Sequence, residues 1–188
     1  MTSTTGTVAA LAAAAFASGY LIWLYNRLIR LRNLVRSSWS DIDVLLKKRH
    51  DLEGNLVETE KGYAAYEKAV LVGVTEARAM AMAAGGPDER GRKETALGET
   101  LKSLFAVAER YPDLKANESF LALQKQLAEI ENGIEYARRY YNAVVRDYTT
   151  GTETFPSNLV AARFGFGREE YFRLESTTER EKADVRLA

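Results

Sequence analysis

The chain has 188 residues, of which 46% are hydrophobic and 28% charged, values typical of one folded domain with room for further segments. Its 26 basic residues equal its 26 acidic residues in number, and a net charge of zero argues against a general nucleic-acid binder. There is no cysteine, which excludes disulfides, thiolate zinc sites and thiol nucleophiles. Only three prolines interrupt long runs of helical periodicity, so the expected fold class is all-α.

An uncharged run begins at Met1 and extends to Asn26. At a rise of ~1.5 Å per residue, a helix of this length crosses a hydrocarbon core of about 30 Å. The run therefore predicts an N-terminal transmembrane helix. A signal peptide cleaved after Ala15-Phe16-Ala17 is the alternative, although a basic N-terminal region is missing and the apolar run continues to Tyr25.

The end of this run is typical of a membrane interface. Aromatic residues are enriched at that level of a bilayer, and basic residues are enriched in cytoplasmic segments beside it. No lysine or arginine precedes the span, so we expect the N-terminus outside and the C-terminal domain in the cytoplasm, at a bacterial inner membrane. The residues predicted to lie at the membrane interface are Trp23, Tyr25, Arg27, Arg30, Arg32 and Arg36.

An apolar heptad stripe follows the membrane span. Most residues at steps of seven from Leu28 and from Leu31 are apolar or aromatic, the pattern of a helix that packs against other helices. No proline occurs before Pro87, so we expect helix one to continue to about Ala84, with bends allowed at its glycines. The part near the membrane should exceed what other helices cover. The predicted self-assembly seam is Leu28, Leu31, Val35, Trp39 and Ile42.

Two further long helices are predicted. The first begins at Pro87, which suits an initial helical turn, and ends near Tyr111, because the next residue is proline. The second follows Asn117, a good N-cap, and should stop at about 149–151, where two threonines precede a glycine. Short connections between such helices favour antiparallel neighbours.

The last part of the predicted fold is short. A helix from Phe155 to Ala161, which Phe164-Gly165-Phe166-Gly167 then breaks, and an aromatic turn at 169–172 should supply a fourth element. Alternating charges from Arg173 onward predict a solvated or disordered tail. The predicted organisation is an N-terminal transmembrane helix that continues into a long antiparallel three- to four-helix bundle. Its segments are 1–26 for the membrane helix, 27–172 for the bundle and 173–188 for the tail.

Motifs along most of the chain occur together in a characteristic order. They include Trp39-Ser40-x-Ile42-Asp43-Val44-x-Leu46-Lys47-Lys48-Arg49-His50-Asp51-Leu52, Tyr111-Pro112-x-Leu114-Lys115-Ala116 and Phe155-Pro156-Ser157-Asn158-Leu159-Val160-Ala161. From about Tyr25 to Phe172 the chain resembles the LemA family. The resemblance implies a bacterial single-pass membrane protein with a helical-bundle domain and carries no catalytic residues. One departure is Glu53-Gly54, where the resemblance implies Ile-Pro.

The sequence offers little for a reaction centre. His50 is the only histidine, and a carboxylate-bridged di-iron bundle needs two Glu-x-x-His motifs. Although Glu53 could share its face, two ligands do not make a metal site, so we interpret His50 as a surface residue. Arg49 lies on the apolar stripe; we favour a side chain that extends past its neighbours into solvent over a buried structural charge. No metal, cofactor or small-molecule substrate is predicted.

These observations favour a protein that is not an enzyme. The predicted function is a membrane-anchored helical scaffold that self-associates or docks a partner at the cytoplasmic membrane face. Its expected partners are the lipid bilayer and further copies of the chain, with a membrane protein as the other candidate. The alternative is a regulatory adaptor for a membrane enzyme or sensor, acting as a monomer. A metal-dependent enzyme has the least support.

Overall fold

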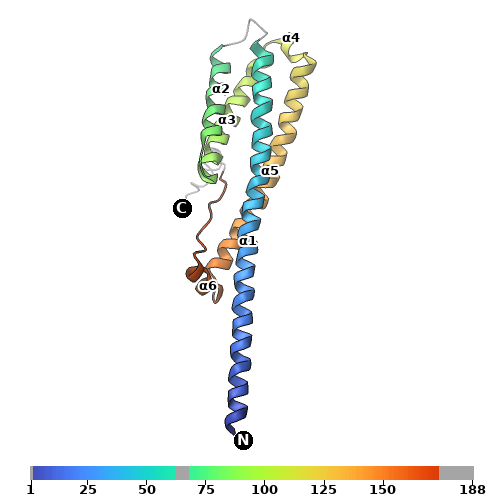
Figure 1. Cartoon of the computed structure of the whole chain (residues 1–188). Helices are drawn as coiled ribbons and strands as arrows, with labels where there is room; N and C mark the ends of the chain where they lie inside the picture. Colours follow the sequence, from blue (N-terminus) through green and yellow to red (C-terminus); the bar gives the residue numbers. More distant parts are fainter. Residues whose placement is uncertain (1, 62–67, 174–188) are drawn as a thin grey trace, which may run out of the picture. The chain divides into compact units, whose positions relative to one another are not determined.

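The computed structural model describes residues 2–61 and 68–173, which form helices and connecting segments without a strand (Figure 1). This result confirms the predicted all-α fold. The helices of the described residues are α1 (Thr2–Lys61), α2 (Lys68–Ala83), α3 (Pro87–Ala108), α4 (Pro112–Lys115), α5 (Glu118–Glu153) and α6 (Ser157–Phe164). The predicted tail lies outside the described residues, apart from Arg173. The chain forms two compact units: unit 1 contains Met1–Trp39 and Tyr141–Glu169, and unit 2 contains Ser40–Tyr140 and Glu170–Ala188.

Unit 1 is built on the first part of α1 and the last part of α5. The heptad stripes of the two helices face each other, and the rings of Trp39 and Tyr141 have centroids 5.4 Å apart. Gly151 makes this contact close, because a Cβ added there would lie 3.3 Å from the side chains of both Leu28 and Leu31. We predicted that α5 would stop at this glycine, but it continues to Glu153. Tertiary packing therefore outweighs the low helix propensity of glycine here.

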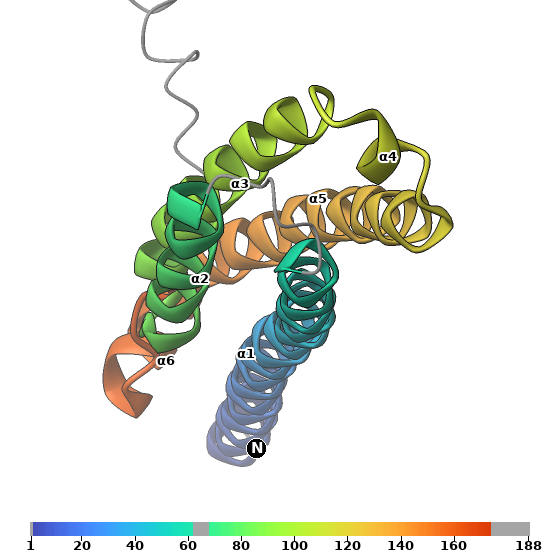
Figure 2. The same ribbon diagram turned by 90° about the horizontal axis from the view of Figure 1, so that it is seen from above.

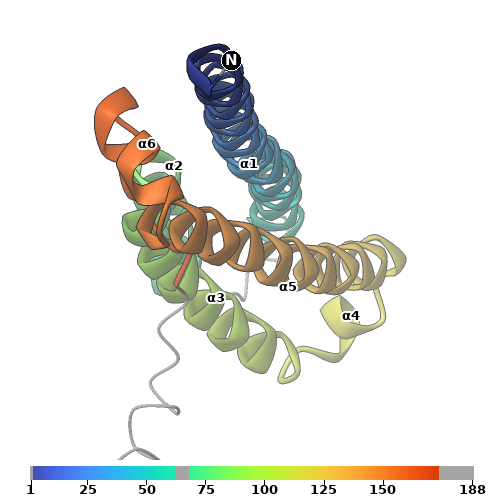
Figure 3. The same cartoon turned by 90° about the horizontal axis from the view of Figure 1, so that it is seen from below.

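The short helix α6 follows α5 within unit 1 (Figure 3). Pro156 directly precedes its first residue, close to the predicted start. The helix ends at Gly165, which has the left-handed conformation (φ 69°) that glycine adopts without strain. The backbone N–H of Phe166 then donates to the carbonyl of Ala161 at 3.0 Å, which closes the helix end. The predicted break after Phe164 is confirmed.

Unit 2 contains the last part of α1, α2, α3 and the first part of α5, which run alternately in opposite directions (Figures 1 and 2). The predicted N-cap of α5 is confirmed, because Asn117 Oδ1 accepts a hydrogen bond of 3.0 Å from the backbone N–H of Phe120. The short helix α4, which was not predicted, connects α3 to α5. Apolar side chains from all these elements form one core, with Leu56, Val74, Leu97, Leu114 and Phe120 among its buried members.

The prediction of one helix up to Ala84 is wrong. Arg78 of α2 donates from Nε to the backbone carbonyl of His50 in α1 at 2.8 Å, although the two residues are 28 positions apart. A continuous helix would separate them by ~42 Å. Hence α2 packs against α1 as a separate helix and is the fourth helix of this bundle, and the prediction of the segment after Phe155 as the fourth element is wrong. A run without proline permits a helix, but burial of its apolar face decides where it lies.

The predicted docking of the last aromatic turn is confirmed for Phe172, which is buried in unit 2. Its segment has no helical structure and crosses α3 at Gly91. A Cβ added to Gly91 would lie 2.0 Å from the carbonyl oxygen of Arg173, so only glycine admits the backbone there. A glycine inside α3 therefore provides the docking position of the C-terminal segment.

We predict that Gly91→Ala displaces the segment at Phe172 and lowers the free energy of unfolding by about 3 kcal/mol, the loss expected when a large aromatic side chain leaves a core. Gly133→Ala is the matched control, since its Cβ would lie at least 3.5 Å from the nearest atom, Leu45 Cδ2. That variant should gain about 0.5–1 kcal/mol of helix propensity. Urea unfolding in mild detergent, with hydrogen exchange at 169–173, measures both effects. Equal stability of the two variants would contradict the prediction.

Candidate functional site

The N-terminal part of α1 exposes its apolar side chains. Residues 6–23 are exposed, including Val8, Leu11 and Phe16. The most apolar 18-residue window has a mean hydropathy of 1.7, and only 6% of it is buried. Among the described residues, α1 is the one helix long and apolar enough to cross a membrane. A core helix of a soluble protein would bury such a window, so its exposure indicates membrane association.

The residues predicted at the membrane interface divide into two groups. Trp23 is exposed and stacks on Tyr20, with ring centroids 5.9 Å apart. The Arg27 guanidinium lies 5.6 Å from the centre of the Trp23 ring. Arg30 and Arg36 are also exposed. Such aromatic and basic side chains suit the headgroup level of a bilayer.

The second group contacts the end of α6 instead. Tyr25 meets the rings of Phe164 and Phe166 at centroid distances of 4.9 and 5.8 Å. The Arg32 guanidinium lies 4.9 Å from the centre of the Phe166 ring, a cation–π contact. Two predicted interface residues therefore hold α6 against α1.

The predicted assembly seam lies inside the chain's own fold. Leu28, Val35 and Ile42 are buried, and Leu31 and Trp39 are partly buried. In unit 1 the seam residues pack against α5, as Gly151 and Tyr141 show. In the single chain α5 therefore already occupies the seam in unit 1. Substituting acids at Leu31 and Val35 would disrupt this packing and would not isolate an assembly interface.

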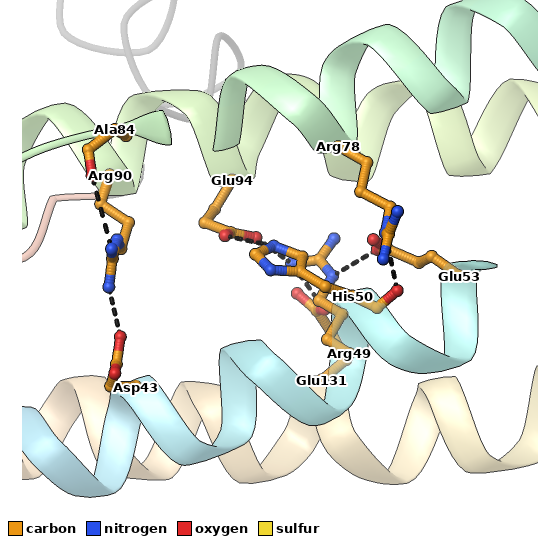
Figure 4. Close-up of polar contacts among 9 residues, drawn as sticks. All are labelled: Asp43, Arg49, His50, Glu53, Arg78, Ala84, Arg90, Glu94 and Glu131. Atoms are coloured by element: carbon orange, nitrogen blue, oxygen red, sulfur yellow. Dashed lines mark hydrogen bonds and ion pairs between the residues drawn. The ribbon is translucent and has the colours of Figure 1, made fainter. Parts of the chain in front are cut away.

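Unit 2 contains a buried cluster of charged side chains around Arg49 (Figure 4). Arg49 is only 4% exposed and pairs with three carboxylates from three helices. Its Nε donates to Glu53 Oε1 of α1 at 3.0 Å, and its Nη1 lies 3.4 Å from both Glu94 of α3 and Glu131 of α5. Gly98 leaves room for the guanidinium, since a Cβ there would lie 3.3 Å from Nη2.

His50 belongs to the same cluster. It is 7% exposed, and its Nε2 lies 2.8 Å from Glu94 Oε1, a hydrogen-bond distance. Its backbone carbonyl accepts the hydrogen bond from Arg78, which adds α2 to the helices joined here. An ion pair between Arg90 and Asp43 joins α3 to α1 further along, as Figure 4 shows.

The favoured interpretations of Arg49 and His50 are therefore wrong. Neither side chain reaches solvent, because carboxylates far away in the sequence compensate for the loss of water. Glu94 was missed, although the sequence contains a signal for it. It precedes Leu97 by three positions and Leu101 by seven, so it lies on the apolar face of α3. A carboxylate on that face indicates a buried partner of opposite charge.

Glu53 is the most perturbed acid of the cluster. It is fully buried, and burial raises the pKa of its carboxyl from 4.5 to about 7. Arg49 and His50 oppose this shift, and Glu94 reinforces it. Within residues 2–61 and 68–173, Glu53 Oε2 has no hydrogen-bond partner, which is consistent with a carboxyl that is readily protonated.

The cluster is suited to holding helices together. No group of three or more histidine, cysteine or acidic residues in the described part of the chain could hold a metal ion. A pocket of about 320 Å³ between α3 and α5 reaches Arg49 and Glu131, but its lining is otherwise mainly apolar and includes Leu101, Phe105 and Leu127. The arrangement fixes which faces of the helices meet, the best-attested use of buried charge.

We predict that Arg49→Met lowers the free energy of unfolding by about 3 kcal/mol or more, because it leaves Glu53 and Glu94 buried without their cation. Arg139→Met is the matched control. Arg139 pairs with Glu135 on an exposed face of α5, and the loss of such a pair changes stability by about 0.5 kcal/mol at most. Urea unfolding at neutral pH in mild detergent compares the two. Equal losses would show that the cluster adds no stability.

The raised pKa of Glu53 predicts a specific pH dependence. The folded state favours the protonated carboxyl, so the contribution of Glu53 is fully present below pH 4.5 and is lost as pH rises to about 7. Relative to Glu53→Gln, the native chain should lose about 3 kcal/mol of unfolding free energy across this range. Unfolding of both proteins from pH 4.5 to 8 measures the difference. A difference that does not change with pH would refute the assignment.

The chain is similar to one protein family and to several known proteins. The sequence model of the LemA family matches residues 38–187. The chain is 27% identical over 179 residues to magnetosome protein MamQ 2 of Paramagnetospirillum magneticum, covering 81% of this chain and 66% of that protein. It is 24% identical over 178 residues to MamQ of Magnetospirillum gryphiswaldense, covering 81% and 65%. It is 25% identical over 164 residues to protein LemA of Metamycoplasma hominis, covering 85% and 72%.

The chain thus spans slightly less than two thirds of the MamQ relatives, and none of these names describes an enzyme. The family match covers most of the chain, from just before Trp39 to the last residues. It includes the residues of the buried charged cluster and the short helix α6, but only the part of α1 from residue 38 onward. The chain belongs to the LemA family.

Proposed function

We propose that this protein is a non-enzymatic, membrane-anchored helical scaffold that self-associates or docks a partner at the cytoplasmic membrane face. The observation that carries the proposal is the exposed, uncharged part of α1, which continues directly into folded helices. The buried charges around Arg49 also support the proposal. They pair with one another between helices, so their role is to hold the fold together.

The proposed orientation follows from the charges beside the span. Arg27, Arg30 and Arg36 are exposed just after the apolar segment, and no basic residue precedes it. This asymmetry favours a cytoplasmic position for the rest of the chain. An anionic leaflet would attract each of these arginines by about 1 kcal/mol.

The surface that we propose for self-association is the small-residue face of the span, at Ala15 and Gly19. Small residues four positions apart let two membrane helices approach closely. A Cβ added at Gly19 would meet nothing within 4 Å, so this face is open in the single chain. The hydroxyl of Ser18 donates to the carbonyl of Ala14 at 2.8 Å, which satisfies that polar group inside the helix, as lipid surroundings require.

We predict that the full-length chain forms a discrete multimer in nanodiscs and that Gly19→Leu lowers the multimer-to-monomer ratio about tenfold. A tenfold change corresponds to ~1.4 kcal/mol of helix–helix contact. Ala17→Leu is the matched control, because it lies about 200° around the helix and should leave the ratio unchanged. Mass photometry gives the distribution. A native chain that is monomeric would refute self-association and favour the adaptor that binds one protein partner.

A further inference from the structure

An apolar pocket lies between α1 and α6 in unit 1. Its volume is about 410 Å³, within the range of small-ligand sites. Leu21, Ile22 and Tyr25 line it from α1, and Leu159, Val160 and Phe164 line it from α6. Leu21 and Ile22 belong to the uncharged membrane segment, so the pocket is continuous with the part of the chain that lies in lipid.

The exposed side chains of α6 and the residue before Pro156 are unusually apolar. Phe155, Leu159 and Phe164 are 75%, 62% and 58% exposed. Three large apolar side chains on so short a segment would be unfavourable in water, and their position beside the membrane segment points to lipid as the medium that covers them. Trp23 on α1, with Arg27 against its ring, places the headgroup level close to the same pocket.

The rim of the pocket carries a positive charge. Arg163 is the remaining lining residue; it is exposed, and its guanidinium lies 5.8 Å from the centre of the Phe164 ring. It forms no ion pair with the residues described in the structure. An apolar chain that carries a negative group at its end matches this combination, because the chain fills the pocket and the group meets the guanidinium.

We propose that α6 is a second membrane contact and that its pocket with α1 holds an acyl chain of an anionic phospholipid from the surrounding bilayer, with Arg163 at the headgroup. The inference rests on membrane anchoring by α1, but it does not require self-association. The end of α5 is then held at the bilayer by α6, in addition to its packing against α1.

The position of α6 is tested by site-directed spin labelling, since the native chain has no cysteine. Leu159→Cys in the full-length chain carries a nitroxide in nanodiscs of phosphatidylcholine and phosphatidylglycerol. Phe16→Cys is the lipid reference, and Tyr136→Cys, exposed on α5, is the aqueous reference. We expect the label at 159 to collide with oxygen and to be protected from a nickel chelate, as at 16. Accessibility like that at 136 would overturn the membrane contact.

The bound lipid is tested by native mass spectrometry of the full-length chain released from the same nanodiscs. We expect phosphatidylglycerol to be retained about fivefold over phosphatidylcholine, the ratio that ~1 kcal/mol per arginine provides. Arg163→Gln should remove this preference. Arg168→Gln is the control, because Arg168 pairs with Glu153 at 2.8 Å and lies outside the pocket. Retention of both lipids equally, or of neither, would overturn the lipid site.

These outcomes separate this inference from the proposed function. If Gly19→Leu loses the multimer but keeps the lipid preference, the result supports self-association and leaves the lipid site intact. An aqueous environment at Phe16→Cys would show that the membrane anchor itself fails, and both proposals would then be wrong. If a second copy occupied the pocket, the label at 159 would be protected from the nickel chelate only in the multimer, and the Gly19→Leu variant would lose this protection. That result would overturn the lipid as occupant.

Discussion

A guanidinium group that is removed from water must find acceptors in the protein, and Arg49 finds them on three helices at once. Glu53, Glu94 and Glu131 come from α1, α3 and α5, and the hydrogen bond from Arg78 to the His50 carbonyl adds α2. Because Glu94 of α3 is buried and pairs with Arg49 and His50 of α1, sliding α3 along α1 would leave buried charge without its partner. The apolar core of unit 2 supplies attraction between the helices, whereas this cluster makes one alignment of them preferable to its neighbours.

Unit 1 is held together by close helix packing and by contacts between aromatic rings. The two tyrosines of the α5 stripe, Tyr141 and Tyr148, are buried, and Gly151 lets α5 approach the leucines of α1 closely. Burial raises the pKa of Tyr148, and Glu169 adds to this effect while Arg32 and Arg36 oppose it, so its hydroxyl stays neutral at physiological pH. The same unit brings α6 to the membrane segment, which explains why the segment from Phe155 to Phe166 contains both buried and exposed aromatic residues.

Much of the fold could be predicted because it depends on local signals. Local signals act through their own backbone or their immediate neighbours. Those identified at or near their place in the structure are the uncharged run, Pro87, Asn117 and the glycine after Phe164. The candidate site was predicted less well. Trp23 and the exposed arginines follow from their place beside the span, whereas Arg49 and His50 were misread because their partner Glu94 is more than forty positions away.

The sequence by itself determined an all-α chain with a membrane segment, the helix ends that caps and prolines mark, and the faces that have to be buried, because composition and periodicity are properties of short stretches. Only the tertiary structure decided what covers those faces. It placed α2 against α1 instead of extending it, and it covered the supposed assembly seam with α5 of the same chain. The physical reason is that an apolar stripe specifies burial but not its partner. That choice depends on how several helices pack together and on which buried charges can be paired.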